Sequence, residues 1–455
     1  MNKKLKIAIF IDHDIIIRHF IHSQVFNKLS TKHQVDFIFP PKGNRRITLD
    51  PHPYIFNSEI IHLEINNKTR SIWSRMSQVI ALRPSLKKYS LDIRKTYRLV
   101  MNWKAEILHT FLGFPIIFEI FKFWTKYQTK LNKNIELINL LRKKKYDFIV
   151  NPGIPLGVFI NDLFILSREL DIPLIYIMNS WDNPSTGFFA AGKPDLYLAW
   201  GPQTYFHAKK YQKINPKNIR CFGAAQFEIY KTKPKIDKNT FLESNNIPPN
   251  SKIILYAGGS LGTNEFEHLK LLEKEIKNGN LQNTFILYRP HPWGGGGNKG
   301  EKIVRENWEF IKIESTMKNY LNSIASEGYK LSFPDYSDTH VVLSYVDCVI
   351  SPLSTILIEA AMHGKPIMCF LPMEDLDAKH FQSVHELPHF REFQTQPEVI
   401  LAKNRLELIN KIKLLFKKKE DPHFSEKILN MCKKFVSDFD ISYSNRFVEL
   451  LENYE

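Results

Sequence analysis

Tyr288-Arg-Pro-His-Pro-Trp293 is the first of two stretches that decide the predicted fold, and the second is Ser351-Pro-Leu-Ser-Thr-Ile-Leu-Ile-Glu-Ala-Ala-Met-His-Gly-Lys-Pro366. Each follows a short apolar run, at 283–288 and 346–350, of the kind that forms a buried strand. Two prolines interrupt the first stretch, whereas the second continues into a helix over 356–363 that a glycine ends. Ligands of an open parallel sheet bind beyond the carboxyl ends of its strands, so we expect both loops to line one crevice.

Strand and helix patterns alternate along the chain in two halves. A strand at 6–11 and a helix over 15–29 open the first half, and further strands are predicted at 34–40, 146–150, 172–178, 196–200 and 218–222. The second half contains strands at 252–256, 283–288, 346–350 and 367–371. This alternation is the signature of parallel sheets covered by helices. It predicts an α/β protein with two Rossmann-like domains.

The composition places the domain boundaries near a stretch rich in Pro, Asn and Lys. The first domain is predicted to cover residues 1–230, with 231–251 as the linker and 252–425 as the second domain. Residues 426–455 are expected to form a C-terminal helix that packs back toward the first domain. A helical, aromatic and basic insertion is predicted over about 71–145. Its apolar stretch lies beside lysines, which fits either a peripheral contact with an anionic membrane or a core helix pair with a solvated basic end.

Charge and cysteine content narrow the class of protein. The 455 residues carry a net charge of +16, from 63 Lys and Arg against 47 Asp and Glu. This excess favours an anionic partner, although a lysine-rich composition alone would also produce it. The four cysteines are far apart without a C-x-x-C pair, which indicates reduced thiols. The apolar run near the N-terminus is too short for a signal peptide, and no run reaches the ~18 apolar residues of a membrane span. We expect a cytoplasmic protein, associated at most with the inner face of the cytoplasmic membrane.

A glycine-rich turn, Ala257-Gly-Gly-Ser-Leu-Gly-Thr263, follows the first strand of the second half. Its spacing does not match the dinucleotide-binding fingerprint G-x-G-x-x-G. Glycines at a helix start nevertheless let a ligand approach the backbone closely. Gly258, Gly259 and Ser260 are therefore predicted to contact a bound nucleotide.

The motifs around His291, Asp335 and Glu359 carry a family resemblance. Leu287 to Trp293, Phe333-Pro-Asp335 and the stretch 351–366 resemble the C-terminal half of bacterial surface-polysaccharide glycosyltransferases of the GT-B type. That group includes capsule and lipopolysaccharide enzymes, Kdo and sialic-acid transferases and polyglycerolphosphate polymerases. The resemblance covers roughly 253–371. It implies two domains that face each other across a cleft, with the nucleotide held by the second.

The resemblance assigns roles to individual residues of the second half. It implies that His291 and Pro292 border the phosphate and base of the donor, with Asp335 nearby. Arg289 would neutralise the charge of the leaving group. The residues that would bind phosphate are Ser351, Ser354 and Thr355.

Glu359 would accept hydrogen bonds from the ribose hydroxyls, a task suited to a carboxylate. Its neighbours in the predicted helix are apolar, so an unpartnered carboxylate there would be costly. Retaining GT-B enzymes with an E-x-x-x-x-x-x-E helix carry a second acid seven residues earlier, where this chain has Pro352. This difference argues against a retaining mechanism by that route.

An inverting transfer needs a general base, which we expect in the first domain. The candidates are Asp12, His13, Asp14 and Asp182, and Asp14 and Asp182 are preferred. The two D-x-D patterns, at 12–14 and 375–377, are weak metal motifs, so no metal and no cofactor besides the nucleotide-sugar substrate are predicted.

The sequence thus predicts a metal-independent, inverting glycosyltransferase. Its donor would be a CMP-, CDP- or UDP-linked sugar, and its acceptor a surface polysaccharide or a lipid-linked glycan. A UDP-sugar 2-epimerase or a CDP-glycerol-type glycerophosphotransferase could share the fold. A basic nucleic-acid-binding protein is a more distant alternative, because no RNA-binding signature or zinc finger is present and the lysines are scattered.

Overall fold

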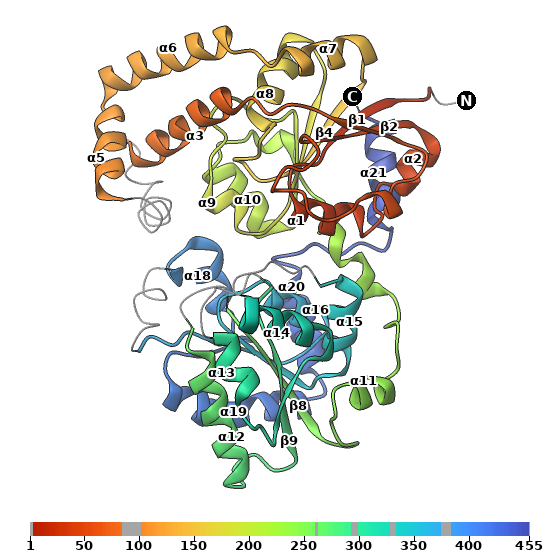
Figure 1. Ribbon diagram of the computed structural model, residues 1–455, viewed down its shortest axis with the longest axis vertical. Coiled ribbons are helices and arrows are strands. Elements are labelled where there is room, and N and C mark those ends of the chain that lie inside the picture. The colour runs from red at the N-terminus through yellow and green to blue at the C-terminus, as the bar shows by residue number, and fades with distance from the viewer. Residues whose placement is uncertain are drawn as a thin grey trace. The chain divides into compact units, whose positions relative to one another are not determined.

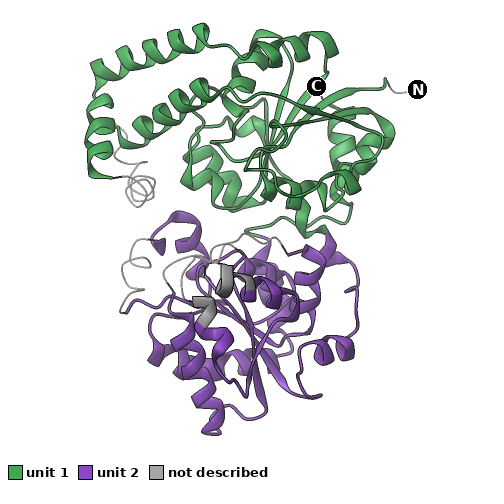
Figure 2. Cartoon of the chain, viewed as in Figure 1, with its two compact units in different colours: residues 1–228, 434–455 green, residues 229–433 purple. Residues whose placement is uncertain are grey.

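The computed structural model describes residues 3–83, 102–259, 263–292, 299–327, 334–374 and 384–454. The chain divides into two compact units, coloured green and purple in Figure 2. Unit 1 comprises residues 1–228 and 434–455, and unit 2 comprises residues 229–433. The chain therefore completes unit 2 before its last residues rejoin unit 1.

Two predicted segments divide differently between the units. The stretch 231–251, predicted as a linker, belongs to unit 2 and contains helix α11 (Lys238–Ser244). The stretch 426–455, predicted as one helix, is split between α20 (Phe424–Cys432) of unit 2 and α21 (Tyr443–Glu452) of unit 1. A helix forms within 231–251 because a short capped helix tolerates the polar residues that also mark linkers. Residues 434–455, within the stretch expected to pack back toward the first domain, belong to unit 1.

Unit 1 is built on a parallel sheet of seven strands in the order β3-β2-β1-β4-β5-β6-β7. The inner strands are almost wholly apolar because helices cover both faces of a parallel sheet. One core cluster joins alternate residues of β1 (Ile7 and Ile9) to Phe447 of the C-terminal helix α21. The strands are β1 (Lys6–Phe10), β2 (Gln34–Phe39), β3 (Glu59–His62), β4 (Phe148–Gly153), β5 (Leu174–Met178), β6 (Leu196–Ala199) and β7 (Ile219–Cys221).

The helix predicted over 15–29 is interrupted. The chain forms α1 (Asp14–Ile16), a π-helical turn (Ile17–Ile21) and, after a break, α2 (Asn27–Lys32). Gln24 lies in the break with a φ of 57°, a left-handed conformation that a right-handed helix cannot contain. The apolar periodicity gave no sign of this break.

The predicted helical insertion lies between β3 and β4. It contains α3 (Asn67–Leu82), α5 (Trp103–Leu112), α6 (Pro115–Leu131) and α7 (Ile135–Lys144). Figure 1 shows α3, α5 and α6 together at one side of unit 1. The other helices of unit 1 are α8 (Ile160–Glu169), α9 (Asn183–Thr186) and α10 (Pro202–Lys210).

Unit 2 contains a parallel sheet of six strands in the order β10-β9-β8-β11-β12-β13. The two sheets confirm the predicted α/β class, since the first strand of each lies in the middle of its sheet and the strand order reverses beside it. The strands are β8 (Lys252–Ala257), β9 (Thr284–Arg289), β10 (Ile311–Ile313), β11 (Cys348–Ser351), β12 (Ile367–Phe370) and β13 (Ile400–Ala402). Besides α11 and α20, the helices are α12 (Glu265–Lys277), α13 (Lys299–Arg305), α14 (Lys318–Glu327), α15 (Tyr336–Tyr345), α16 (Ile356–Met362), α18 (Pro388–Gln394) and α19 (Arg405–Glu420).

No single helix of the described residues has both the length and the hydropathy that a membrane crossing requires. The pair α5 and α6 meets them jointly, but the two helices are bent by 94° at the short break between them. The four cysteines are all free.

Candidate functional site

The loops after β8 and β11 meet in unit 2, where the strand order of the sheet reverses. Strands β8 and β11 are neighbours, with Tyr256 opposite Ile350. A Cβ on Gly259, in the loop after β8, would lie 3.3 Å from Cγ of Pro352, in the loop after β11. The glycine loop and the serine loop are therefore in contact at the position where open α/β sheets bind ligands.

Glu265, the first residue of α12, organises the glycine loop. Its Oε1 accepts hydrogen bonds from the backbone N–H of Gly259 at 2.9 Å and from Oγ1 of Thr263 at 2.8 Å. Its Oε2 accepts one from the hydroxyl of Tyr288. A Cβ on Gly258 would lie 2.7 Å from this carboxylate, so only glycine fits there without displacement. No role was predicted for Glu265, although an acid in the first turn of a helix after a glycine loop is a recognisable sequence pattern.

The predicted phosphate-binding hydroxyls lie in the loop between β11 and α16. Oγ of Ser351 is buried and has no hydrogen-bond partner within the described residues. Ser354 and Thr355 are half-buried, and Thr355 precedes α16 without a side-chain capping bond. The loop thus presents hydroxyl groups that the described part of the protein leaves unsatisfied or only partly covered.

Glu359 lies in α16, one turn beyond this loop, and is 7% exposed. The hydroxyl of Tyr230 donates a hydrogen bond to its Oε2. Its backbone oxygen lies 2.7 Å from Nδ1 of His363, whose Nε2 lies 2.8 Å from Nδ1 of His340. The partner that an acid in an apolar helix requires is therefore Tyr230, which no sequence pattern pointed to.

Arg289 ends β9 in a buried position. Its Nε lies 3.9 Å from Oε2 of Glu314, and its Nη2 donates to Oγ1 of Thr339 at 2.9 Å. Its Nη1 is buried without a hydrogen-bond partner in the described ranges. Since Glu314 already balances its charge, Arg289 is held as part of the framework and has one nitrogen left for a further acceptor.

The residues after β9 are also fixed from the backbone side. His291 and Pro292 are half-buried, and the hydroxyl of Tyr320 donates to the carbonyl oxygen of Pro292 at 2.8 Å. Asp335 is exposed and caps α15, because its Oδ1 accepts the backbone N–H of Ser337 at 3.0 Å. The remaining predicted positions, Ser260, Trp293, Phe333 and the pair 375–377, lie outside the described residues.

Asp12 occupies the corresponding reversal point of unit 1, between β1 and β4. Its Oδ2 accepts the backbone N–H of Val158 at 2.7 Å, and a Cβ on Gly157 would lie 2.5 Å from the same oxygen. Its Oδ1 is buried and lacks a partner among the residues that the structure describes. Burial raises the pKa of Asp12, against the opposing effect of the Arg46 guanidinium. Asn151 of the neighbouring strand β4 adds side-chain amide atoms that have no hydrogen-bond partner among the described residues.

The two preferred candidates for the general base have different surroundings. Asp14 accepts three hydrogen bonds, from the backbone N–H of Thr48 at 2.8 Å, from that of Leu49 at 2.9 Å and from Oγ1 of Thr48. Both of its oxygens therefore hold the 48–49 segment. Asp182 precedes α9, where burial raises its pKa. His13 accepts the backbone N–H of Ile15 on Nδ1, which leaves the proton of the neutral ring on Nε2.

Metal-ligating side chains do not gather in the described residues, where no group of three or more His, Cys, Asp or Glu could hold an ion. The carboxylates of Asp12 and Asp14 instead hold separate backbone segments. The D-x-D pattern at 12–14 is thus two unrelated anchors.

Neither a family model nor a curated protein matches the chain. Solved structures match along its whole length. A protein of Listeria monocytogenes, assigned provisionally as a UDP-N-acetylglucosamine 2-epimerase, has a TM-score of 0.55 at 14% identity, covering 99% of this chain and 96% of that one. The UDP-GlcNAc 2-epimerase of Neisseria meningitidis, bound to UDP-GlcNAc, has a TM-score of 0.53 at 12% identity, covering 99% of this chain and 100% of that one. The calicheamicin glycosyltransferase has a TM-score of 0.53 at 10% identity, covering 99% of this chain and 98% of that one.

The chain has the GT-B fold. In this fold, two Rossmann-like units each present the carboxyl edge of a parallel sheet. The matched proteins include both glycosyltransferases and sugar-nucleotide epimerases, and at these identities the likeness concerns the fold alone. The two reversal points, one around Asp12 and one around the glycine and serine loops, are therefore the candidate functional sites.

Proposed function

We propose that this GT-B protein is a glycosyltransferase that moves a sugar from a CMP-, CDP- or UDP-linked donor to a surface polysaccharide or a lipid-linked glycan. The observation that carries the proposal is the contact between the glycine loop and the serine loop at the reversal point of unit 2, through Gly259 and Pro352. The hydroxyl groups of Ser351, Ser354 and Thr355 lie beside the glycine loop there, and a phosphate group requires such hydrogen-bond donors. The particular transferase group that the sequence resembles remains part of this proposal.

On the donor side, the phosphate is bound by Ser351, Ser354 and Thr355. Glu359 accepts hydrogen bonds from the ribose hydroxyls, and the hydroxyl of Tyr230 holds its carboxylate in place. The free Nη1 of Arg289 offers a donor to the departing phosphate. The remaining contacts of the donor are assigned to His291, Pro292, Gly258, Gly259, Ser260 and Asp335.

On the acceptor side, we assign the general base to Asp12. The acceptor oxygen attacks the anomeric carbon while the bond from that carbon to the phosphate oxygen breaks. The nucleotide departs with the bonding electrons, and the acceptor's proton passes to Oδ1 of Asp12. Its raised pKa makes this carboxylate a stronger base than an ordinary aspartate. Asp14, whose oxygens are occupied, is assigned a structural role, and Asp182 is the alternative base. No step requires a metal ion.

The insertion supplies a membrane contact in this proposal. On α6, the residues at 116, 120, 123, 127 and 131 recur at helical spacing and are exposed, with Ile116 79% and Phe123 73% accessible. Lys122, Lys126 and Lys130 form a row beside them. Exposed apolar side chains flanked by lysines suit the surface of an anionic bilayer. Co-sedimentation of the protein with anionic vesicles tests this contact.

Thermal shift with CMP, CDP, UDP and GDP tests the donor site, and mass spectrometry of glycan acceptors incubated with the matching sugar nucleotide tests transfer. We expect one nucleotide to raise the melting temperature and its sugar to appear on an acceptor. Stabilisation by none of the four nucleotides would reject the donor site. The matched epimerases make a 2-epimerase the second candidate function. If the protein is a 2-epimerase, UDP-GlcNAc should change its configuration at C2 without any acceptor.

A further inference from the structure

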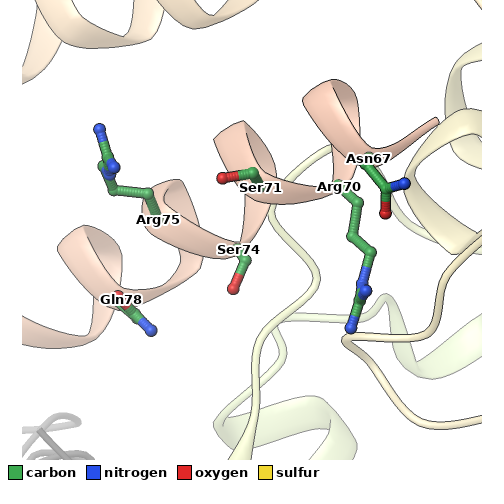
Figure 3. A pocket seen from close by; sticks show the side chains of 6 residues that line it. All are labelled: Asn67, Arg70, Ser71, Ser74, Arg75 and Gln78. Carbon is green, nitrogen blue, oxygen red and sulfur yellow. The ribbon is translucent and has the colours of Figure 1, made fainter.

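One face of α3 forms a polar pocket of about 410 Å³ in unit 1 (Figure 3). Its lining recurs at the spacing of a single helix face. Arg70, near the start of the helix, and Arg75, one and a half turns later, supply the charge. The other lining residues are Asn67, Ser71, Ser74 and Gln78. No acidic side chain lines this pocket among the described residues.

The arginine end of the pocket lies near the reversal point of unit 1. The pKa of half-buried Arg70 is lowered by burial and by the positive charges of Arg46 and Arg45, and Asp12 acts in the opposite direction. Arg46 donates from Nε to the backbone oxygen of Asp12 at 3.1 Å. Within the described ranges, none of Arg45, Arg46, Arg70 and Arg75 has a carboxylate in ion-pair contact. Because Asp12 is the one carboxylate of the described residues that acts on Arg70 against the charges of Arg45 and Arg46, this group of cations favours an incoming anion.

The far end of the pocket lies beside α5. Arg75 is exposed and close enough to His109 of α5 to lower the pKa of that ring, after the larger effect of burial. The opposite face of α3 packs on α6, where Trp73 and Met76 join Phe118 in one apolar cluster. Arg70 and Arg75 are ~7.5 Å apart along the helix axis at 1.5 Å per residue. The pocket thus extends from the surroundings of Asp12 toward helices whose outer surface is apolar.

We propose that this pocket binds the phosphate or diphosphate group of a lipid-linked acceptor. Arg70 holds the phosphate oxygens, because a guanidinium group matches such oxygens bidentately, and Arg75, which points to the other side of α3 (Figure 3), adds its positive charge at the far end. The apolar chain of the acceptor then extends over the exposed side chains of α5 and α6, and its sugar end reaches Asp12. That the ligand is an acceptor rests on the proposed function, whereas the phosphate site is inferred from the pocket alone.

Calorimetric titration of the full-length protein with farnesyl phosphate, with and without UDP, tests the site. We expect Arg70→Gln to weaken binding about ten-fold or more, as loss of a charge-assisted contact does. The exposed Arg75→Gln, which leaves packing intact, should weaken binding too. Arg168→Gln changes an exposed arginine of α8 and should have no effect. Farnesol should bind more weakly than farnesyl phosphate, and equally to the wild type and to Arg70→Gln.

The outcomes separate this inference from the proposed function. Farnesyl phosphate binding that is unchanged in both Arg70→Gln and Arg75→Gln would overturn the phosphate site, even if UDP binds. If inorganic pyrophosphate binds as tightly as farnesyl phosphate, the apolar chain contributes no affinity, and the proposal that the ligand is lipid-linked is overturned. Binding that depends on Arg70 in a protein that none of CMP, CDP, UDP and GDP stabilises would support the phosphate site and count against the transferase.

Discussion

The hydroxyl of Tyr230 donates a hydrogen bond to Oε2 of Glu359, and its ring centre lies 4.6 Å from that of His363. Tyr230 lies near the start of unit 2, far along the chain from α16. The tyrosine therefore fixes a buried carboxylate that is proposed to hold the ribose of the donor.

Replacing Tyr230 by Phe should weaken nucleotide binding about ten-fold, because a hydrogen bond to a charged group contributes about 1.5–3 kcal/mol. Glu359→Gln should weaken it at least as much. Tyr345→Phe is the control, since that hydroxyl donates to the carbonyl of Ile236 elsewhere in unit 2. Calorimetric titration with the nucleotide found by thermal shift gives the measurement. Equal affinities of the wild type and Tyr230→Phe would remove Glu359 from the ribose site.

Asp12→Asn should affect turnover, whereas Asp14→Asn should affect stability. The first should reduce turnover about 10²–10⁴-fold with little loss of stability, because it removes the proton acceptor. The second should lower the free energy of unfolding by about 2 kcal/mol, because the amide cannot accept all three hydrogen bonds. Initial rates and urea unfolding of both variants distinguish these roles. Full activity of Asp12→Asn would contradict this assignment, and the role of general base would then fall to Asp182.

The pH dependence of turnover follows from the same residue. Burial raises the pKa of Asp12 above its ordinary value of 3.8, so the carboxylate loses its capacity to accept a proton as the pH falls through that raised pKa. The wild-type rate at saturating donor should decline on the acid side, and the residual rate of Asp12→Asn should not follow that decline. A rate profile of the variant that parallels the wild type would contradict the assignment.

Gly258→Ala should disturb the glycine loop. The new methyl group would lie 2.7 Å from Oε2 of Glu265, so the carboxylate that binds Gly259 and Thr263 must shift. We expect a loss of about 1–3 kcal/mol in stability and weaker nucleotide binding. Thermal unfolding with and without nucleotide gives both quantities, and an unchanged nucleotide-induced shift would separate this loop from the donor.

The free energy of unfolding of unit 1 should fall as the pH rises toward neutral, because of Asp162. Burial raises its pKa from 3.8 to about 7, and Asn66 is its one hydrogen-bond partner among the described residues. Between these values the folded state binds more protons than the unfolded state, so stability falls as the pH rises from about 4 to 7. Asp162→Asn should be the more stable protein at pH 8, by up to about 4 kcal/mol at 1.36 kcal/mol per pKa unit. Urea unfolding at pH 5 and 8 tests this, and a difference between the proteins that does not change with pH would contradict it.

Phe123→Ser should weaken vesicle binding about ten-fold, because burial of such a side chain contributes about 1.5–3 kcal/mol. Phe206→Ser is the matched control, since Phe206 is exposed on α10, outside the insertion. Sedimentation with anionic and neutral vesicles measures both the apolar and the ionic contribution. Equal losses in the two variants would show that α6 is not the contact.

The sequence by itself determined the class of fold and the strand ends after which the predicted motifs lie. Apolar runs closed by an acid, a glycine pair or a serine–proline pair marked the central strands β1, β8 and β11 correctly, because hydrophobic period and the residues that end it are local properties of the chain. It also located the serine loop and the helix that carries Glu359. Local pattern failed at the helix predicted over 15–29, where one left-handed residue, Gln24, breaks the helix.

Only the tertiary structure decided which of these residues act together. The pairing of Tyr230 with Glu359, the anchoring of the glycine loop by Glu265, and the difference between Asp12 and Asp14 depend on contacts between segments distant in sequence or on burial. Two aspartates with one residue between them look alike in a sequence. They differ in the fold because Asp14 binds the 48–49 segment through both of its oxygens, whereas Asp12 keeps one oxygen without a partner in the described protein.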